Sequence, residues 1–298
     1  MLKSIEEILS ALKDHKYIAD RALATIIYLA QALKKPILLE GEPGVGKTEV
    51  AKVIAHVLGT KLIRLQCYEG LDASTSLYEW NYSKQILAIK MEEIKGGSKE
   101  DIESTIFSEK YLLKRPLLEA IQTDSALPPI LLIDEIDRSD EEFEAFLLEI
   151  LSDFQISIPE IGTIKAKKYP IVVITSNRTR ELHDALKRRC LYHWIDYPTF
   201  EKEHEIVITK VPEIKEILAN QICNFMQEVR QMDFNKKPGI AETLDWALAL
   251  IALNKDELDK ETTEQTLGCI LKHNQDISRF KAEFGKESIA EPWTLCCK

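Results

Sequence analysis

Cysteines are few in this sequence, and their spacing matches neither a metal site nor a redox motif. The six cysteines stand at positions 67, 190, 223, 269, 296 and 297, and no two of them form a Cys-x-x-Cys pair. Zinc sites depend on such spacings, and disulfide frameworks on cysteine-rich secreted domains. The sequence therefore favours neither a zinc site nor a disulfide framework.

Long apolar runs and a basic leader are also missing. The most apolar stretch, residues 24–33, is half of the roughly 20 residues that a membrane-spanning helix needs, and Gln31 interrupts it. The first residues mix acidic and apolar side chains and do not follow the basic-then-apolar order of a secretory signal. We expect a soluble, cytoplasmic protein with no membrane partner.

Basic residues are the minority charge. Lys and Arg number 39 against 49 Asp and Glu, which gives a net charge of −10. This balance does not attract a phosphate backbone, so we expect no nucleic-acid partner, although a local basic stripe stays open. With 45% hydrophobic and 30% charged residues over 298 positions, the chain has the composition of a globular protein of two domains.

Short apolar runs alternate with helical periodicity in the first two thirds of the chain. Apolar runs of this kind favour an α/β fold with a parallel sheet and helices on both faces. After Pro198 the strand-like runs stop, and the remaining patterns are helical. We therefore predict an α/β core over 1–198 and a small all-helical lid domain over 199–298. The predicted core strands lie within 36–41, 61–67, 129–135, 170–177 and 191–198.

Two segments interrupt the core pattern. Residues 92–109 are polar and charged with a Gly-Gly pair, which predicts an exposed helical insertion or loop. Residues 154–165 alternate apolar and polar side chains around a Pro-Glu-Ile-Gly turn, which predicts a β-hairpin. The hairpin is either surface decoration or an element that presents side chains to a partner.

A phosphate-binding motif follows the first predicted strand. The segment GEPGVGKT matches G-x-x-x-x-G-K-[ST] and opens a predicted helix. Its glycines let backbone N–H groups face phosphates, and the helix N-terminus favours negative charge. Lys47 is expected to reach the β- and γ-phosphates of ATP, and the Thr48 hydroxyl to ligate Mg²⁺. The nucleotide-binding candidates are Gly41, Glu42, Pro43, Gly44, Val45, Gly46, Lys47, Thr48 and the next helical residue, Glu49.

Two further strands end in polar side chains. The run ILLIDE ends in Asp134 and Glu135, and buried strands seldom end in adjacent carboxylates without a cation or proton transfer to serve. Asp134 is a candidate for the Mg²⁺ shell and Glu135 for activating the attacking water. Asn177 ends the run IVVITSN, where its amide can hold that water or the γ-phosphate. The alternative for Asp134 and Glu135 is a solvated strand end, and the alternative for Asn177 is an ordinary asparagine in a turn.

These segments together resemble the Walker A, Walker B, sensor 1 and arginine-finger segments of AAA+ ATPases, the last in DALKRRC. The chain also resembles the MoxR family, and within it the CoxD-like branch most. This resemblance is in the sequences of the segments YIADRAL, LYEWNYSKQILAIK, FQISIPEIGTIK and SNRTRELHDALKRRCLYHW. The likeness covers about residues 14 to 255. It implies a chaperone-like ATPase ring, often a hexamer. It also implies a partner with a von Willebrand factor A domain and a metalloenzyme client, of which a molybdenum-containing enzyme is the example in the CoxD-like branch.

The resemblance also implies roles for single residues. Arg188 or Arg189 is the finger that reaches a neighbour's γ-phosphate, and we favour Arg189 because it is nearer the following strand. Tyr17 and Ile18 stand where adenine packs, or else belong to the core of the first helix. Gln66 is expected to restrain Glu135.

One family feature is absent from the sequence. MoxR-like chains carry a nucleotide-contacting arginine in a G-A-S-P-R-A-like lid segment, where this chain has GIAETL over 239–244. Either Lys236 or Lys237 replaces that arginine, or the lid responds through packing.

The function predicted from the sequence is Mg²⁺-dependent ATP hydrolysis that drives the remodelling or maturation of a protein client. The alternatives are an AAA+ nucleic-acid motor and a nucleotide-gated scaffold that hydrolyses little.

Overall fold

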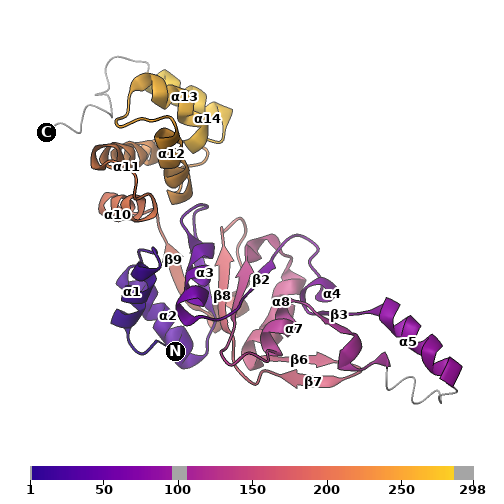
Figure 1. Ribbon diagram of the computed structural model, residues 1–298. Coiled ribbons are helices and arrows are strands. Elements are labelled where there is room, and N and C mark those ends of the chain that lie inside the picture. The colour runs from indigo at the N-terminus through magenta and orange to yellow at the C-terminus, as the bar shows by residue number, and fades with distance from the viewer. Residues whose placement is uncertain (1, 96–105, 285–298) are drawn as a thin grey trace. The chain divides into compact units, whose positions relative to one another are not determined.

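The structure is a computed structural model that describes residues 2–95 and 106–284 (Figure 1). Its contacts divide the chain into two compact units that are not contiguous in sequence. The sheet unit consists of Met1–Ile8, Arg21–Glu40 and Thr48–Trp194, and the helical unit of Leu9–Asp20, Gly41–Lys47 and Ile195–Lys298. The 198/199 domain boundary stays a prediction, and the phosphate-binding loop groups with the helical unit.

A five-stranded sheet with helices around it forms the sheet unit, as the sequence predicted. The strand order is β2-β5-β8-β1-β9, and β1, β2, β5 and β8 pair in parallel. The three central strands β1, β5 and β8 are buried on both faces, and their sequences are accordingly almost continuously apolar. The strands are β1 Ile37–Gly41, β2 Leu62–Gln66, β5 Ile130–Asp134, β8 Ile171–Ser176 and β9 Leu191–Ile195.

Helices pack against the sheet through apolar side chains. Leu65, Ile133 and Ile174 belong to one buried cluster with Leu118 and Leu147 from two of these helices. A side-chain cap starts α8, because the Asp140 carboxylate accepts a hydrogen bond from the Phe143 N–H. The helices are α1 Ile5–Asp14, which continues into the helical unit, α2 Arg21–Leu33, α3 Lys47–Leu58, α7 Pro116–Ile121, α8 Glu141–Asp153 and α9 Asp184–Arg189.

Two small antiparallel pairs extend the sheet unit. The hairpin predicted over 154–165 is confirmed as β6 Gln155–Ile158 and β7 Gly162–Lys165. The second pair, β3 Tyr78–Trp80 and β4 Leu112–Lys114, was not predicted. Helix α4 Ala73–Ser76 precedes β3, and α5 Tyr82–Lys95 follows it.

The insertion predicted over 92–109 is only partly described. Residues 92–95 complete α5, and Glu109 begins the short 3₁₀ helix Glu109–Tyr111. Residues 96–105 of that insertion lie outside the described residues.

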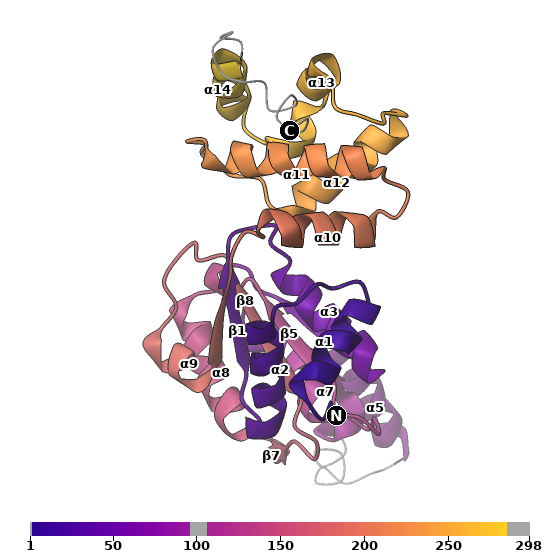
Figure 2. The same ribbon diagram turned by 90° about the vertical axis from the view of Figure 1, so that its left-hand side faces the viewer.

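In the described part of the chain, five helices build most of the helical unit. Trp246 and Phe225 pack at its centre. Glu203 and Arg230 form a buried ion pair there, with two N–H groups of Arg230 donating to the two carboxylate oxygens at 2.6 and 2.7 Å. Figure 2 shows α10 and α11 side by side. The helices are α10 Phe200–Lys210, α11 Glu216–Gln231, α12 Ile240–Ala252, α13 Lys260–Ile270 and α14 Asn274–Phe284. Among the described residues, no helix is both long and apolar enough to span a bilayer.

Candidate active site

The phosphate-binding loop joins β1 to α3 and is closed by its own lysine. Lys47 is the first residue of α3, and its Nζ donates hydrogen bonds to the carbonyl oxygens of Gly41 at 2.8 Å and Glu42 at 2.7 Å. Gly44 and Gly46 have φ angles of +80° and +95°, which only glycine adopts without strain. The sequence motif therefore folds into a tight loop at a helix N-terminus, which is the local structure that binds phosphate.

The same loop touches the N-terminus of α12 within the helical unit. The Ala241 N–H donates a hydrogen bond of 3.1 Å to the Gly44 carbonyl oxygen. A Cβ on Gly239 would lie 2.8 Å from the Pro43 carbonyl oxygen, so this approach needs glycine. The contact lies in the GIAETL segment, which spans residues 239–244.

Asp134 ends β5 in the sheet unit and is almost fully buried. Its Oδ1 accepts hydrogen bonds from the hydroxyls of Thr48 at 2.9 Å and Thr175 at 2.6 Å. Its Oδ2 accepts two from the Arg64 guanidinium. The sequence placed Thr48 and Asp134 in one site, and the structure brings them together in the sheet unit. Arg64 and Thr175 were missed.

Glu135 is held in a left-handed turn directly after Asp134. Its φ and ψ are 56° and 51°, and its N–H donates to the Thr175 hydroxyl at 2.9 Å. Its carboxylate accepts a hydrogen bond from the Gln66 side-chain amide at 3.0 Å and pairs with Arg138 at 3.4 Å. The expected contact between Gln66 and Glu135 is present. A non-glycine residue in this conformation is uncommon, and such positions concentrate at functional sites.

Asn177 follows β8, the strand between β1 and β5 in the sheet. Its backbone N–H donates to Oδ1 of Asp137 at 3.1 Å, and the Thr179 N–H and hydroxyl donate to Oδ2 of the same carboxylate. Asp137 is 3% exposed. This buried carboxylate therefore fixes the turn that carries Asn177.

The two candidate finger arginines differ in their surroundings. Arg189, at the end of α9, donates from Nε to the Ser152 hydroxyl at 2.7 Å and from Nη1 to the Ala185 carbonyl oxygen at 3.1 Å. Arg188 is exposed, and among the residues that the structure describes its side chain has no hydrogen-bond or ion-pair partner. The structure thus holds the favoured candidate against α8 of its own chain.

The candidate adenine contacts lie outside any helix. Lys16 has a φ of 60°, and the Tyr17 N–H donates to the Leu12 carbonyl oxygen at 2.9 Å, which ends α1 before Tyr17. Tyr17 and Ile18 are half-buried and belong to the helical unit, as does the loop 41–47. The alternative that they form the core of the first helix is wrong. Glu49, in the first turn of α3, pairs with Lys52.

Cys67 lies directly behind the acidic turn. Burial raises the pKa of its thiol to about 12, and the negative charges of Asp134, Asp137 and Glu135 act in the same direction. The thiol is therefore protonated at neutral pH, which is not the state of a nucleophile or metal ligand.

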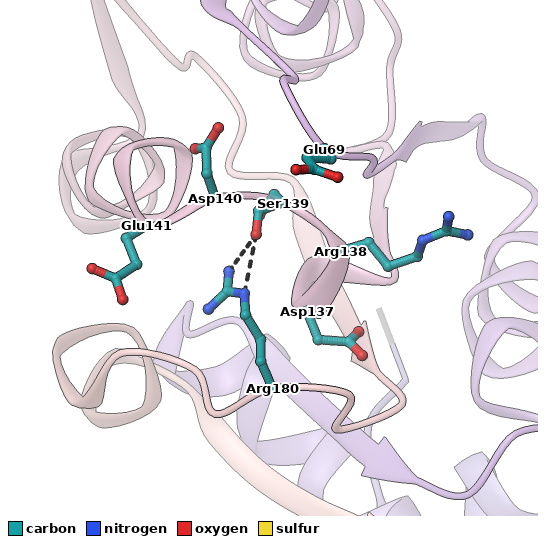
Figure 3. Close-up of a pocket in the computed structure, with 7 residues that line it drawn as sticks. All are labelled: Glu69, Asp137, Arg138, Ser139, Asp140, Glu141 and Arg180. Atoms are coloured by element: carbon teal, nitrogen blue, oxygen red, sulfur yellow. Dashed lines mark hydrogen bonds between the residues drawn. The ribbon is translucent and has the colours of Figure 1, made fainter.

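A cleft of about 390 Å³ lies along the turn that follows Glu135 (Figure 3). Arg180 crosses its floor and donates two hydrogen bonds to the Ser139 carbonyl oxygen, at 2.6 and 3.1 Å. Arg180 also pairs with Glu144, which is 1% exposed. The residues that line the cleft are Glu69, Asp137, Arg138, Ser139, Asp140, Glu141 and Arg180.

The family model named "ATPase family associated with various cellular activities (AAA)" matches residues 37–195, which contain β1, the Walker motifs and β9. The chain belongs to the AAA ATPase family. An AAA ATPase binds and hydrolyses ATP, and the loop at 41–48 and the acids at 134–135 stand inside the matched range. The predicted α/β AAA+ fold is confirmed by this match together with the sheet.

Curated relatives of this AAA ATPase are much longer proteins. Lon protease 1 of Bacillus subtilis is 29% identical over 136 residues, which are 43% of this chain and 14% of that protein. Replication factor C subunit 1 of Oryza sativa is 26% identical over 164 residues, 53% of this chain and 13% of that protein. Lon protease of Fusobacterium nucleatum is 24% identical over 225 residues, which are 68% of this chain and 25% of that protein. The chain thus spans a quarter or less of the length of each.

Solved structures of RuvB from Thermotoga maritima are also similar to this AAA ATPase. One mutant form is 17% identical, with a TM-score of 0.49, and the match covers 98% of this chain and 88% of that one. Another mutant form is 18% identical, with a TM-score of 0.47, and the match covers 89% of this chain and 71% of that one.

Proposed function

We propose that this AAA ATPase is a ring-forming, Mg²⁺-dependent remodelling ATPase of the MoxR type that acts on a protein client. The donor set fits Mg²⁺, because the Thr48 hydroxyl and the Asp134 carboxylate are hard oxygen groups 2.9 Å apart. Bound Mg²⁺ would neutralise charge on the nucleotide phosphates.

Residues of the chain itself bind the phosphates, activate the water and compensate the transition-state charge. Lys47 supplies a positive charge to the β- and γ-phosphates once it leaves the carbonyls of its loop. Glu135 orients the attacking water and takes its proton, and the Asn177 amide holds that water or the γ-phosphate. A guanidinium of a neighbouring protomer, Arg189 or else Arg188, compensates charge in the transition state.

The exposed apolar surface of α5 is the observation that favours a protein client. Figure 1 shows this helix standing off from the sheet. Clustered exposed apolar side chains on one element mark a protein-binding surface, whereas a nucleic-acid interface is basic. The exposed fractions are 63% for Tyr82, 55% for Ile86, 59% for Leu87, 52% for Met91 and 86% for Ile94.

The finer identity rests on the sequence resemblance. The MoxR likeness supports a ring, often a hexamer, a partner with a von Willebrand factor A domain and a metalloenzyme client such as a molybdenum enzyme. Co-purification with a protein that contains such a domain would support this assignment.

Client-stimulated hydrolysis tests the proposal. We expect a permanently unfolded protein, such as reduced and carboxymethylated lactalbumin, to raise the ATPase rate of the full chain several-fold. Leu87→Ser should remove most of that stimulation and leave the basal rate unchanged. Leu33→Ser is the matched control, because Leu33 is equally exposed, at 56%, at the end of α2.

The outcomes separate the competing functions. Equal stimulation of the Leu87→Ser and parental proteins would remove α5 from client binding. Stimulation by DNA or RNA, with the steep salt dependence of phosphate contacts, would identify a nucleic-acid motor instead. A basal phosphate-release rate near zero, with or without unfolded protein, would favour the nucleotide-gated scaffold.

A further inference from the structure

Arg64 saturates the carboxylate that the proposed function assigns to Mg²⁺. Its Nε and Nη2 donate to Oδ2 of Asp134 at 3.0 and 2.5 Å. Oδ1 already accepts from the hydroxyls of Thr48 and Thr175. A carboxylate offers about four lone-pair sites, so all of them are engaged. No Mg²⁺ ion or Mg²⁺-bound water can reach this carboxylate unless one donor leaves.

Of the donors to Asp134, Arg64 is the one that water can replace. Its side chain is 50% exposed on the edge strand β2, whereas Thr175 is 1% exposed inside the sheet. A guanidinium that swings into solvent recovers its hydration, but a buried hydroxyl that loses its acceptor does not. The Thr48 hydroxyl is itself a proposed Mg²⁺ ligand, so it is expected to stay beside Asp134 when Mg²⁺ binds.

The same guanidinium is connected to the second acid. Arg64 Nη2 also donates to the Gln66 side-chain oxygen at 2.5 Å, and the Gln66 amide donates to Oε2 of Glu135 at 3.0 Å. Arg64 and Gln66 are two residues apart on one strand and face the same side of the sheet. One hydrogen-bonded chain therefore runs from Asp134 through Arg64 and Gln66 to Glu135.

We propose that Arg64 is a positioning residue that occupies Asp134 until Mg²⁺ arrives and then releases Gln66 from the chain that holds Glu135. The proposal rests on the Mg²⁺ role assigned to Asp134 above. Two cations, the guanidinium and Mg²⁺, compete for one carboxylate. The departure of Arg64 removes the charged donor from the Gln66 oxygen, so the Gln66 amide is free to turn and the Glu135 carboxylate becomes available to water.

Competition for the Asp134 carboxylate and simple structural support predict different effects of Arg64→Gln on nucleotide binding in Mg²⁺ and in EDTA. Arg64→Gln removes the competing charge, so the Mg²⁺ concentration that half-saturates nucleotide binding should fall about fivefold, the order expected for one partly exposed ion pair. Nucleotide binding in EDTA should be unchanged or weaker, because a nearby positive charge is lost. A residue that only supported the fold would make binding weaker in both conditions.

The experiment is an equilibrium titration of the full chain with a fluorescent ADP analogue, in EDTA and over a series of Mg²⁺ concentrations. Arg64→Lys keeps the charge but not the forked donors, and should lie between the parent and Arg64→Gln. Arg115→Gln is the matched control, since Arg115 is 42% exposed and pairs with Glu79 in the same unit. Thermal melting of each variant checks folding, and Arg64→Lys carries the comparison if Arg64→Gln does not fold.

The possible failures are distinguishable. If the parental protein binds the analogue equally well with and without Mg²⁺, the proposed Mg²⁺ site is wrong and the role of Arg64 falls with it. If the parent depends on Mg²⁺ but Arg64→Gln has the same or a higher requirement, only the Arg64 proposal is overturned.

Discussion

The ammonium group of Lys47 donates hydrogen bonds within its own loop. Its Nζ contacts the carbonyl oxygens of Gly41 and Glu42, and only 6% of the residue is exposed. Phosphate oxygens therefore replace existing hydrogen bonds when nucleotide binds. The exchange is favourable because bonds between an ammonium and an anionic oxygen are stronger than those to a neutral carbonyl.

We expect Lys47→Ala to abolish ATP binding at micromolar concentrations. Two lost charge-assisted hydrogen bonds correspond to about 3 kcal/mol, or roughly a 100-fold weaker affinity. A fluorescent ATP analogue measures the loss. Lys52→Ala, which removes an exposed lysine of the same helix, is the control and should bind normally. Undiminished binding by Lys47→Ala would contradict the loop assignment.

The sequence located the residues whose roles depend on local context. Asp134 ends an apolar strand and Glu135 follows it, and Lys47 belongs to a motif that begins at the end of another strand, so these candidates were visible in the sequence. Arg64 was missed because its partner, Asp134, is 70 residues away and only the pairing of β2 with β5 brings them together. Thr175 reaches the same carboxylate from β8 and gives no local signal either.

Helix α12 is the element that meets the phosphate-binding loop within the helical unit. Gly239 precedes the helix, and the Ala241 N–H reaches the Gly44 carbonyl oxygen. The Glu242 carboxylate accepts a hydrogen bond from the Gly239 N–H at 3.0 Å, which closes the first turn. We therefore expect a change in the loop to be felt at the first turn of α12.

We expect Gly239→Ala to weaken ATP binding about tenfold. The added Cβ would lie 2.8 Å from the Pro43 carbonyl oxygen, and overpacking of this kind costs about 1–3 kcal/mol, which the loop must absorb. Gly268→Ala is the control, because a Cβ there meets nothing within 4 Å. That control should keep its ATP affinity and gain up to about 1 kcal/mol of stability, since Gly268 lies inside α13. Equal affinities for both variants in calorimetry would argue against coupling.

Elements were predicted where periodicity is strong and long. The five core strands and the hairpin at 154–165 have clear patterns and are present. Strands β3 and β4 have three residues each and pair across about 30 intervening positions, so no local pattern marks them. The alternative that placed Tyr17 and Ile18 in the first helix is wrong because a left-handed turn at Lys16, which carries no glycine signal, follows α1.

Catalysis at a protomer interface is the prediction that belongs to the whole molecule. A finger arginine contributes roughly 10³–10⁵ in rate, so Arg189→Ala should bind ATP normally and hydrolyse it that much more slowly. Glu135→Gln should also bind ATP but lack the base. In mixed rings some interfaces pair an intact Glu135 with an intact Arg189, so mixing the two inactive proteins should restore measurable phosphate release.

Subunit exchange must be shown independently with labelled protomers. Mixed rings without recovered hydrolysis, or an Arg189→Ala protein with the parental rate, would exclude Arg189. Arg188 would then be the finger, and the same mixing experiment with Arg188→Ala would test it. The hydrogen bond between Arg189 and Ser152 gives a further check, since Ser152→Ala should release the Arg189 side chain without removing it.

The hydrogen bond from Ala241 to the Gly44 carbonyl makes one backbone amide a native reporter. Ala241 lies in the first turn of α12, where an amide has no partner inside its own helix. Its protection against solvent deuterium therefore depends on the loop at Gly44. The exchange rate of this amide, followed with and without ATP, reports how often α12 and the loop separate in a protein that carries no mutation.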